Sequence, residues 1–247
     1  MDAITAAAAS GIQARMQSLD LLANNLANSS AAGYKGDSES YGLYLAPEAA
    51  ESPDGTYPAI LAVVQNRWTD FSQGVLIPTG NSTDLALSGK GFFIANTPAG
   101  PLYTRNGNFR LSSGGQIETR EGYSIQGTDG NPITVDSTKP MEVTPQGTVK
   151  QDGADVSQIA VVDFQDPSAL TKRKGSYFVN ASNAPAPAPA AQVEIRQGKL
   201  ESANSESAHS AARLVTVLRQ FEALQKAITI GADMNRRAVE DVAKVGS

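Results

Sequence analysis

The sequence predicts an α+β protein in which helices at the two ends of the chain pair as a coiled coil, with a central antiparallel all-β domain between them. Two observations support this fold class. Apolar residues recur at helical spacing near both ends of the chain. Between the ends, short segments rich in Val, Ile, Tyr and Phe alternate with glycine-containing turns, a pattern typical of antiparallel strands in a sandwich or barrel.

The first predicted helix covers residues 3–28. Four apolar residues recur along it at spacings of seven, three and four, which places them on one helical face. They are Ile12, Leu19, Leu22 and Leu26. Asn28 and the serines after it end the pattern, and Gly33 favours a tight exit turn.

The second predicted helix covers residues 204–245. Its apolar residues alternate steps of three and four, which is a heptad seam. They are Leu214, Val217, Phe221, Leu224 and Ile228. One interpretation is an ordinary amphipathic helix on a core. We favour a coiled coil between the two terminal seams, because long isolated helices are only marginally stable in water.

The central region contains ten short strand candidates between 84 and 179, among them 133–135 and 156–163, and a further candidate lies at 59–69. The turns between them include SSGG (112–115), TDGNP (128–132) and QDG (151–153). The repeated Ala-Pro run at 184–191 is typical of a linker. The predicted boundaries are 1–33 for the N-terminal helix, 34–80 for a connecting segment, 81–183 for the β domain, 184–197 for the linker and a return strand, and 198–247 for the C-terminal helix.

The composition argues against several classes of partner. The chain has 247 residues, a net charge of −5 and a pI near 5.0, with no dense cluster of Lys and Arg, so we expect no nucleic acid. It has no apolar run of about 18 residues, so we expect no membrane insertion. The first residues lack a basic start and a strong apolar core, so we expect no cleaved signal peptide.

The residues needed for catalysis or metal binding are largely missing. The chain has no cysteine, and its single histidine, His209, lies in a helical segment with no acid placed to orient it. The SGKGFF segment at 88–93 lacks the spacing of a phosphate-binding loop. We therefore predict no catalytic residue, no metal site and no cofactor.

Three blocks of the sequence carry a specific resemblance. They are ANNLANSSAAGYK at 23–35, the region 80–127 with DLALSGKGFF and YTRNGNF, and a C-terminal block at 198–238 that begins GKLESANS. In this order they resemble the flagellar rod and hook proteins, the axial family of the flagellar basal body. Ala203 stands where the family usually has Ser.

The resemblance implies a non-enzymatic, structural axial subunit of the flagellar basal-body rod, which crosses the periplasm. It implies export by the flagellar type III apparatus, helical assembly through the terminal helices with copies of itself and other rod and hook proteins, and transmission of torque. We expect the interface to comprise Ile12, Leu19, Leu22, Asn25, Leu26, Asn28, Leu214, Val217, Phe221, Leu224 and Ile228. The asparagines either fix the register between neighbours or simply end the helix.

Within the family, the start MDAITAAA and the short 36–80 segment fit the FlgF-type proximal rod subunit. A FlgG-type distal rod subunit or a hook-like subunit is the main alternative. Outside the family, a cell-wall-acting enzyme and an assembly chaperone are less favoured. The enzyme needs close carboxylates or a partnered histidine, and the chaperone needs a fully ordered monomer that does not self-assemble.

Overall fold

A computed structural model describes residues 3–45, 60–205 and 207–245. The chain forms two compact units, each built from distant parts of the sequence. The helical unit comprises the described residues of Met1–Ala27, Asp37–Trp68 and Ser207–Ser247. The β unit comprises those of Asn28–Gly36 and Thr69–Glu206. The part of the predicted connecting segment at 46–59 lies outside the described residues.

The helical unit contains two long helices and a two-stranded sheet. Helix α1 is Ala3–Ala27 and helix α3 is Ser207–Val245. Strand β1, Asp37–Leu45, pairs with β2, Ile60–Thr69. Both helices lack proline and contain many alanines, which favours helix. Helix α1 ends where Asn28 accepts a hydrogen bond from the Ala31 amide at 2.9 Å, so the chain turns there.

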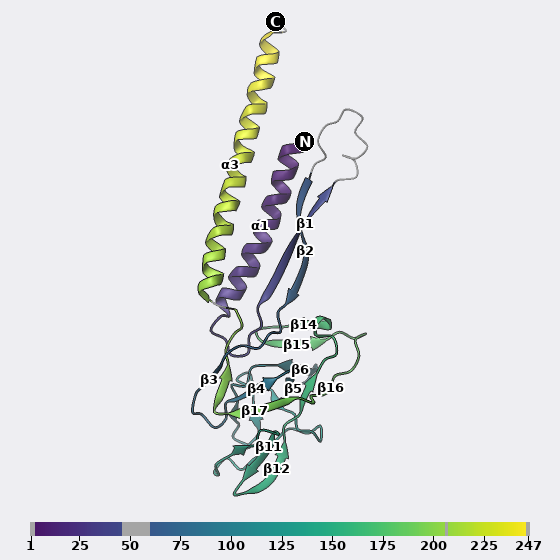
Figure 1. The fold of residues 1–247 in the computed structure, drawn as a ribbon, viewed down its shortest axis with the longest axis vertical. Helices are drawn as coiled ribbons and strands as arrows, with labels where there is room; N and C mark the ends of the chain where they lie inside the picture. The colour runs from purple at the N-terminus through teal and green to yellow at the C-terminus, as the bar shows by residue number, and fades with distance from the viewer. Residues whose placement is uncertain (1–2, 46–59, 206, 246–247) are drawn as a thin grey trace. The chain divides into compact units, whose positions relative to one another are not determined.

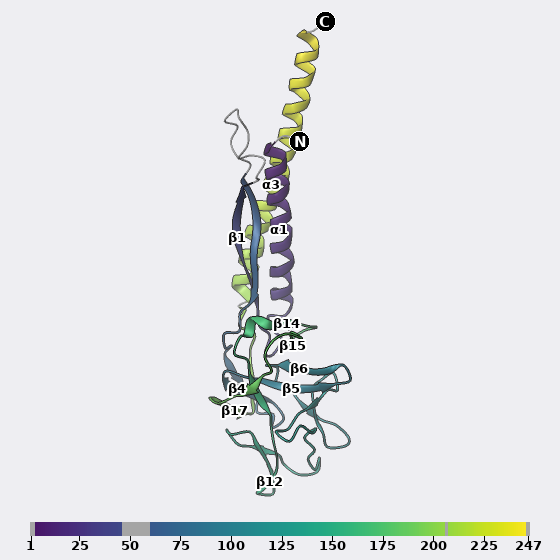
Figure 2. The same ribbon diagram turned by 90° about the vertical axis from the view of Figure 1, so that its right-hand side faces the viewer.

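Helix α1 contacts both α3 and β1, and so lies between the other helix and the strand pair (Figure 1). At 1.5 Å per residue, α1 is about 38 Å long and α3 about 58 Å long. Figure 2 shows the C-terminal part of α3 running past the start of α1. The last turns of α3 therefore extend beyond the partner helix.

The β unit consists of antiparallel strands in four sheets. The largest sheet has the order β14-β15-β6-β5-β9-β8-β7, and β13 joins it through β5 and carries β16 on its other side. A second sheet has the order β10-β11-β12, and the pairs β17-β4 and β18-β3 complete the unit. The strands are β3 (Leu76–Pro78), β4 (Leu85–Gly89), β5 (Phe92–Thr97), β6 (Gly100–Thr104), β7 (Arg110–Leu111), β8 (Ile117–Glu118), β9 (Ser124–Ile125), β10 (Glu142–Val143), β11 (Thr148–Gln151), β12 (Ala154–Gln158), β13 (Val161–Asp163), β14 (Leu170–Lys172), β15 (Tyr177–Asn180), β16 (Ala188–Pro189), β17 (Val193–Gln197) and β18 (Lys199–Glu201).

Two apolar clusters hold the β unit together. The larger one gathers residues from β4, β5, β8, β9, β11 and β17, including the fully buried Leu85, Leu87 and Phe93. The smaller one is aromatic, with the fully buried Phe178 5.8 Å from the ring of Phe92. Edge-to-face ring pairs of this kind add to the stabilisation from apolar burial.

The structure confirms a largely β protein with two helices and antiparallel sheets. The strand expected at 156–163 is wrong as a single element, because the chain divides into β12 and β13, which belong to different sheets. The strand expected at 133–135 is present only as isolated bridges, although Ile133 and Val135 are buried. Strand β1 was not predicted, because its sequence DSESYGLYL begins with polar residues.

Phe178→Ala tests the aromatic cluster. We expect the β unit to lose about 3–5 kcal/mol of unfolding free energy, because a fully buried ring leaves a cavity. Urea unfolding followed by circular dichroism of the sheet measures the loss. Val156→Ala, at an exposed position of β12, is the control and is expected to cost about 0.5 kcal/mol or less. A similar small loss for both variants would contradict the proposed core.

Candidate assembly interface

The seam predicted on α3 is the least exposed face of that helix. Val217 is buried, with an exposed fraction of 5%, and the other seam residues are half-buried. The half-buried residues are Leu214, Phe221, Leu224 and Ile228. The residues between them are mostly exposed, so the seam is the face that α3 turns toward α1.

The matching residues of α1 are covered to different extents. Leu22 and Asn25 are buried, whereas Ile12, Leu19 and Leu26 are half-buried. Asn28 is half-buried and lies after the helix, in the exit turn. The two helices lie close together at Gly11, where an added Cβ would lie 3.3 Å from Cδ1 of Leu224. A small residue at this position therefore lets the two helices pack closely.

A second face of α1 contacts the strand pair through polar side chains. The Asn25 side chain donates to the Asp37 carbonyl at 2.7 Å and accepts from the Asp37 amide at 2.9 Å. This pair of bonds matches the donor and acceptor of an extended strand, so Asn25 holds the first residue of β1. Asn25 thus has a partner within its own chain, a role that neither sequence interpretation considered.

Ser18 and Tyr41 extend this polar face. The Ser18 hydroxyl hydrogen-bonds the Tyr41 hydroxyl, which donates to Glu39 at 2.6 Å. The guanidinium of Arg15 lies 4.7 Å from the centre of the Tyr41 ring, within the range of a cation–π contact. Sequence reasoning missed this face because its residues are polar and carry no apolar periodicity.

Several large apolar side chains of the helical unit are exposed. On α3 they form two pairs at helical spacing, Val215 with Leu218 and Ile230 with Met234. Met16 on α1 and Trp68 on β2 are also about half exposed. Among the described residues, Met234 is two-thirds exposed and nothing lies within 4 Å of a Cβ built on Gly231. Apolar surface spread along a helix in this way marks a candidate contact site for another protein.

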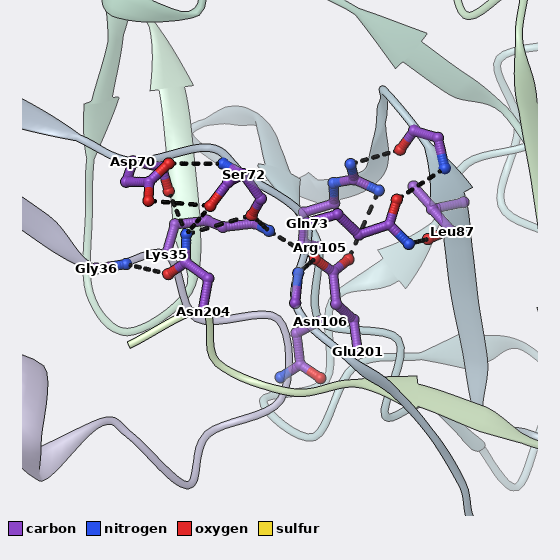
Figure 3. Close-up of polar contacts among 12 residues, drawn as sticks. Lys35, Gly36, Asp70, Ser72, Gln73, Leu87, Arg105, Asn106, Glu201 and Asn204 are labelled. Carbon is purple, nitrogen blue, oxygen red and sulfur yellow. Dashed lines mark hydrogen bonds and ion pairs between the residues drawn. The ribbon is translucent and has the colours of Figure 1, made fainter. Parts of the chain in front are cut away.

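Within the β unit, three charged side chains from distant parts of the sequence meet in the interior. We call Lys35, Arg105 and Glu201 the junction cluster (Figure 3). The Lys35 ammonium lies 2.5 Å from Oε1 of Glu201, and the Arg105 guanidinium lies 3.6 Å from its Oε2. Their side chains are 0%, 4% and 0% exposed, respectively. One carboxylate is therefore shared by two buried cations.

Backbone groups surround the junction cluster and bind it. Lys35 also donates to the Ser72 carbonyl at 2.6 Å, and Arg105 donates to the Gly89 carbonyl at 2.6 Å. The Gly74 amide donates to Oε1 of Glu201 at 2.9 Å. Charged groups in an interior are tolerated when they are paired and hydrogen-bonded in this way.

Burial dominates the electrostatics of the two cations. It lowers the pKa of Lys35 below its usual value, against the opposing effect of the Glu201 carboxylate, and the nearby Arg105 lowers it further. Burial also lowers the pKa of Arg105, again opposed by Glu201. The shared carboxylate therefore offsets only part of the desolvation cost of both cations.

Sequence reasoning did not identify the junction cluster. Lys35 ends the first of the three sequence blocks, Arg105 lies in YTRNGNF of the second, and Glu201 lies in GKLESANS of the third. Each block contributes one member of the cluster, but the second and third blocks hold other charged residues as well, so nothing in the sequence marked these three. Only the fold brings these residues together, since they are separated by 70 and 96 positions along the chain.

His209 is exposed on α3, as expected for a solvent-facing helical residue. Within residues 3–45, 60–205 and 207–245, no group of three or more His, Asp or Glu side chains is placed to hold a metal ion. No helix in these ranges is both long and apolar enough to cross a membrane.

Gly11→Leu tests the close approach of the two helices. We expect it to destabilise the helical unit by about 1–3 kcal/mol relative to Gly231→Leu, because the new side chain would overlap Leu224. Both variants replace a helical glycine and gain the same helix propensity, so the difference reports packing alone. Thermal unfolding followed by the helical circular dichroism signal measures it. Equal stability of the two variants would show that the helices do not pack at Gly11.

Comparison with known proteins places these features in a family. Residues 86–153, all within the β unit, match the family model described as the flagellar hook protein FlgE/F/G D1 domain. The chain is 31% identical to the flagellar basal-body rod protein FlgF of Caulobacter vibrioides over 228 residues, which cover 92% of each chain.

Two further relatives extend the comparison. The chain is 29% identical to FlgF of Mesorhizobium japonicum over 206 residues, 83% of each chain. It is also 29% identical to the rod protein FlgG of Agrobacterium fabrum over 254 residues, which cover 93% of this chain and 95% of that relative. The similarity thus spans the terminal helices as well as the β unit, and the chain belongs to the flagellar basal-body rod protein family.

Proposed function

We propose that this chain is a structural axial subunit of the flagellar rod that assembles helically through its terminal helices. The observation that carries the proposal is the apolar surface that the pair of helices leaves exposed to solvent. Helix α1 contacts α3 and β1, while α3 extends past it and exposes Ile230 and Met234. A neighbouring subunit would supply the missing apolar contacts, and their burial would stabilise assembly.

The exposed apolar residues also favour assembly into a filament over a closed dimer. The exposed apolar pairs lie on α3 and the exposed Trp68 lies on β2, so two unlike elements of the helical unit present apolar side chains to a neighbour. Contacts between unlike surfaces are head-to-tail, and they build a helical filament when the rotation does not close. In this proposal α1 and α3 pair as a coiled coil whose outer face contacts the next subunit.

The position within the rod is a finer proposal. We favour the FlgF type, consistent with the 31% identity to the Caulobacter vibrioides protein. The FlgG type is the second candidate, favoured by the Agrobacterium fabrum relative, which aligns over 254 residues. Export by the flagellar type III apparatus, a site in the periplasmic part of the basal body and transmission of torque belong to the same proposal.

The double variant Leu218→Glu and Ile230→Glu tests assembly through the outer face of α3. We expect it to fold normally, because both side chains are exposed, with 42% and 51% of their surface accessible. We also expect loss of swimming and of rods in isolated basal bodies, because two charges would be buried without partners between subunits.

The matched control is Gln220→Glu with Gln225→Glu, which adds the same charge at exposed polar positions of the same helix. We expect this control to swim and to assemble. Normal rods built from the apolar-to-charged variant would contradict assembly through this face, and loss of assembly in both variants would attribute the effect to charge alone.

A further inference from the structure

We propose that the junction cluster is a closure device, in which docking of Glu201 locks the β unit as its last folding step. The inference concerns the order in which this chain becomes ordered, and it holds whatever the chain's position in a rod. It starts from the arrangement of charges. Without Glu201, the interior would hold two cations, Lys35 and Arg105. Arg105 disfavours the charged form of Lys35, and the remaining carboxylates that act on the pair are Asp70 and Asp163.

Glu201 also binds the backbone of two other segments. Its carbonyl accepts from the Gly33 amide at 2.7 Å, and its carboxylate accepts from the Gly74 amide at 2.9 Å. We call the segments 28–36, 69–74 and 198–205 the junction segments. A single residue thus connects all three of them through both its main chain and its side chain.

Asn204 reinforces the same connection. Its side-chain carbonyl accepts from the Gly36 amide at 2.7 Å, and its side-chain amide donates to the Asp70 carbonyl at 2.7 Å (Figure 3). Its own backbone amide donates to the Tyr34 carbonyl at 3.3 Å. Docking of residues 201–204 therefore orders the two other junction segments, 28–36 and 69–74.

Glycines stand at two positions where the junction segments make close backbone contacts. Gly33 has a positive φ of 65°, and a Cβ added to it would lie 2.3 Å from the backbone of Arg105. A Cβ on Gly74 would lie 2.1 Å from the Ser202 carbonyl oxygen. A side chain larger than glycine at either position would overlap the neighbouring backbone and prevent docking.

The sheets do not need this closure in order to form. The strands of the largest sheet lie within residues 92–189, all before Glu201, and β18 pairs only with β3. Since a chain is synthesised from its N-terminus, Glu201 also arrives after the sheet strands. In this proposal, the segment that follows α1 stays undocked until the C-terminal part of the chain, with Glu201, is present.

Amide hydrogen exchange on the full-length Glu201→Gln variant tests the proposal. We expect about 100-fold faster exchange or more at the Gly33, Gly36 and Ser202 amides, because removing one partner leaves buried charges uncompensated. We expect less than about 3-fold change at the amides of β5 and β6. Glu194→Gln, which breaks an exposed ion pair with Arg196, is the control and should leave all of these amides unchanged.

A milder variant covers the case in which Glu201→Gln does not fold. Glu201→Asp keeps the charge but shortens the side chain, so the junction amides should again exchange faster than those of β5, by a smaller factor. Equal acceleration throughout the β unit, or no acceleration at the junction amides, would overturn the proposal.

Pulse-labelled refolding of the unmodified chain tests the order of events. We expect the β5 and β6 amides to become protected before those of Gly33 and Gly36. Protection of the junction amides first, or of both groups together, would show that closure is not the last step.

Discussion

The order of the three junction segments depends on one interaction, the Glu201 carboxylate that Lys35 and Arg105 share. Two buried cations, brought from positions 35 and 105, have it as their common counter-ion. The desolvation cost of the carboxylate is offset only when the surrounding backbone donors and both cations are in place. We therefore propose that the main effect of this buried cluster is to specify one arrangement of the chain, and that its contribution to stability is smaller. It fixes the segments that lead out of α1 and into α3, and these helices are the parts that we propose for assembly.

The helical unit is held together by a narrow apolar seam and by polar contacts. Its helices meet through a narrow seam with a glycine at the close approach, and polar residues such as Ser18 and Asn25 bind the strand pair. The apolar residues left exposed on α3 are a cost for a single chain and a source of binding free energy for a polymer. A locked β unit and an incompletely covered helical unit together suit a subunit whose final contacts come from its neighbours.

The parts of the structure that depend on periodicity were predictable from the sequence. Both terminal helices, the Gly-rich turns and most strands of the β unit follow from local patterns. Strand β1 was not predictable because it begins with the polar residues Asp37, Ser38 and Glu39, and because Asn25 of α1, a distant residue, holds its first residue. The proposed interface residues lie on the two helices, except Asn28, which follows α1, and their role in assembly remains a prediction. The junction cluster escaped prediction because long-range charge pairing has no periodic signature.

A double-mutant cycle between Lys35 and Glu201 tests the central role of the shared carboxylate most directly. The variants are Lys35→Met, Glu201→Gln and their combination, and the quantity measured is the opening free energy at the Gly33 and Gly36 amides by hydrogen exchange. We expect a coupling energy of about 2 kcal/mol or more, because each single variant leaves a buried charge that the combination removes in part. Additivity within about 0.5 kcal/mol would contradict a closure that depends on this ion pair.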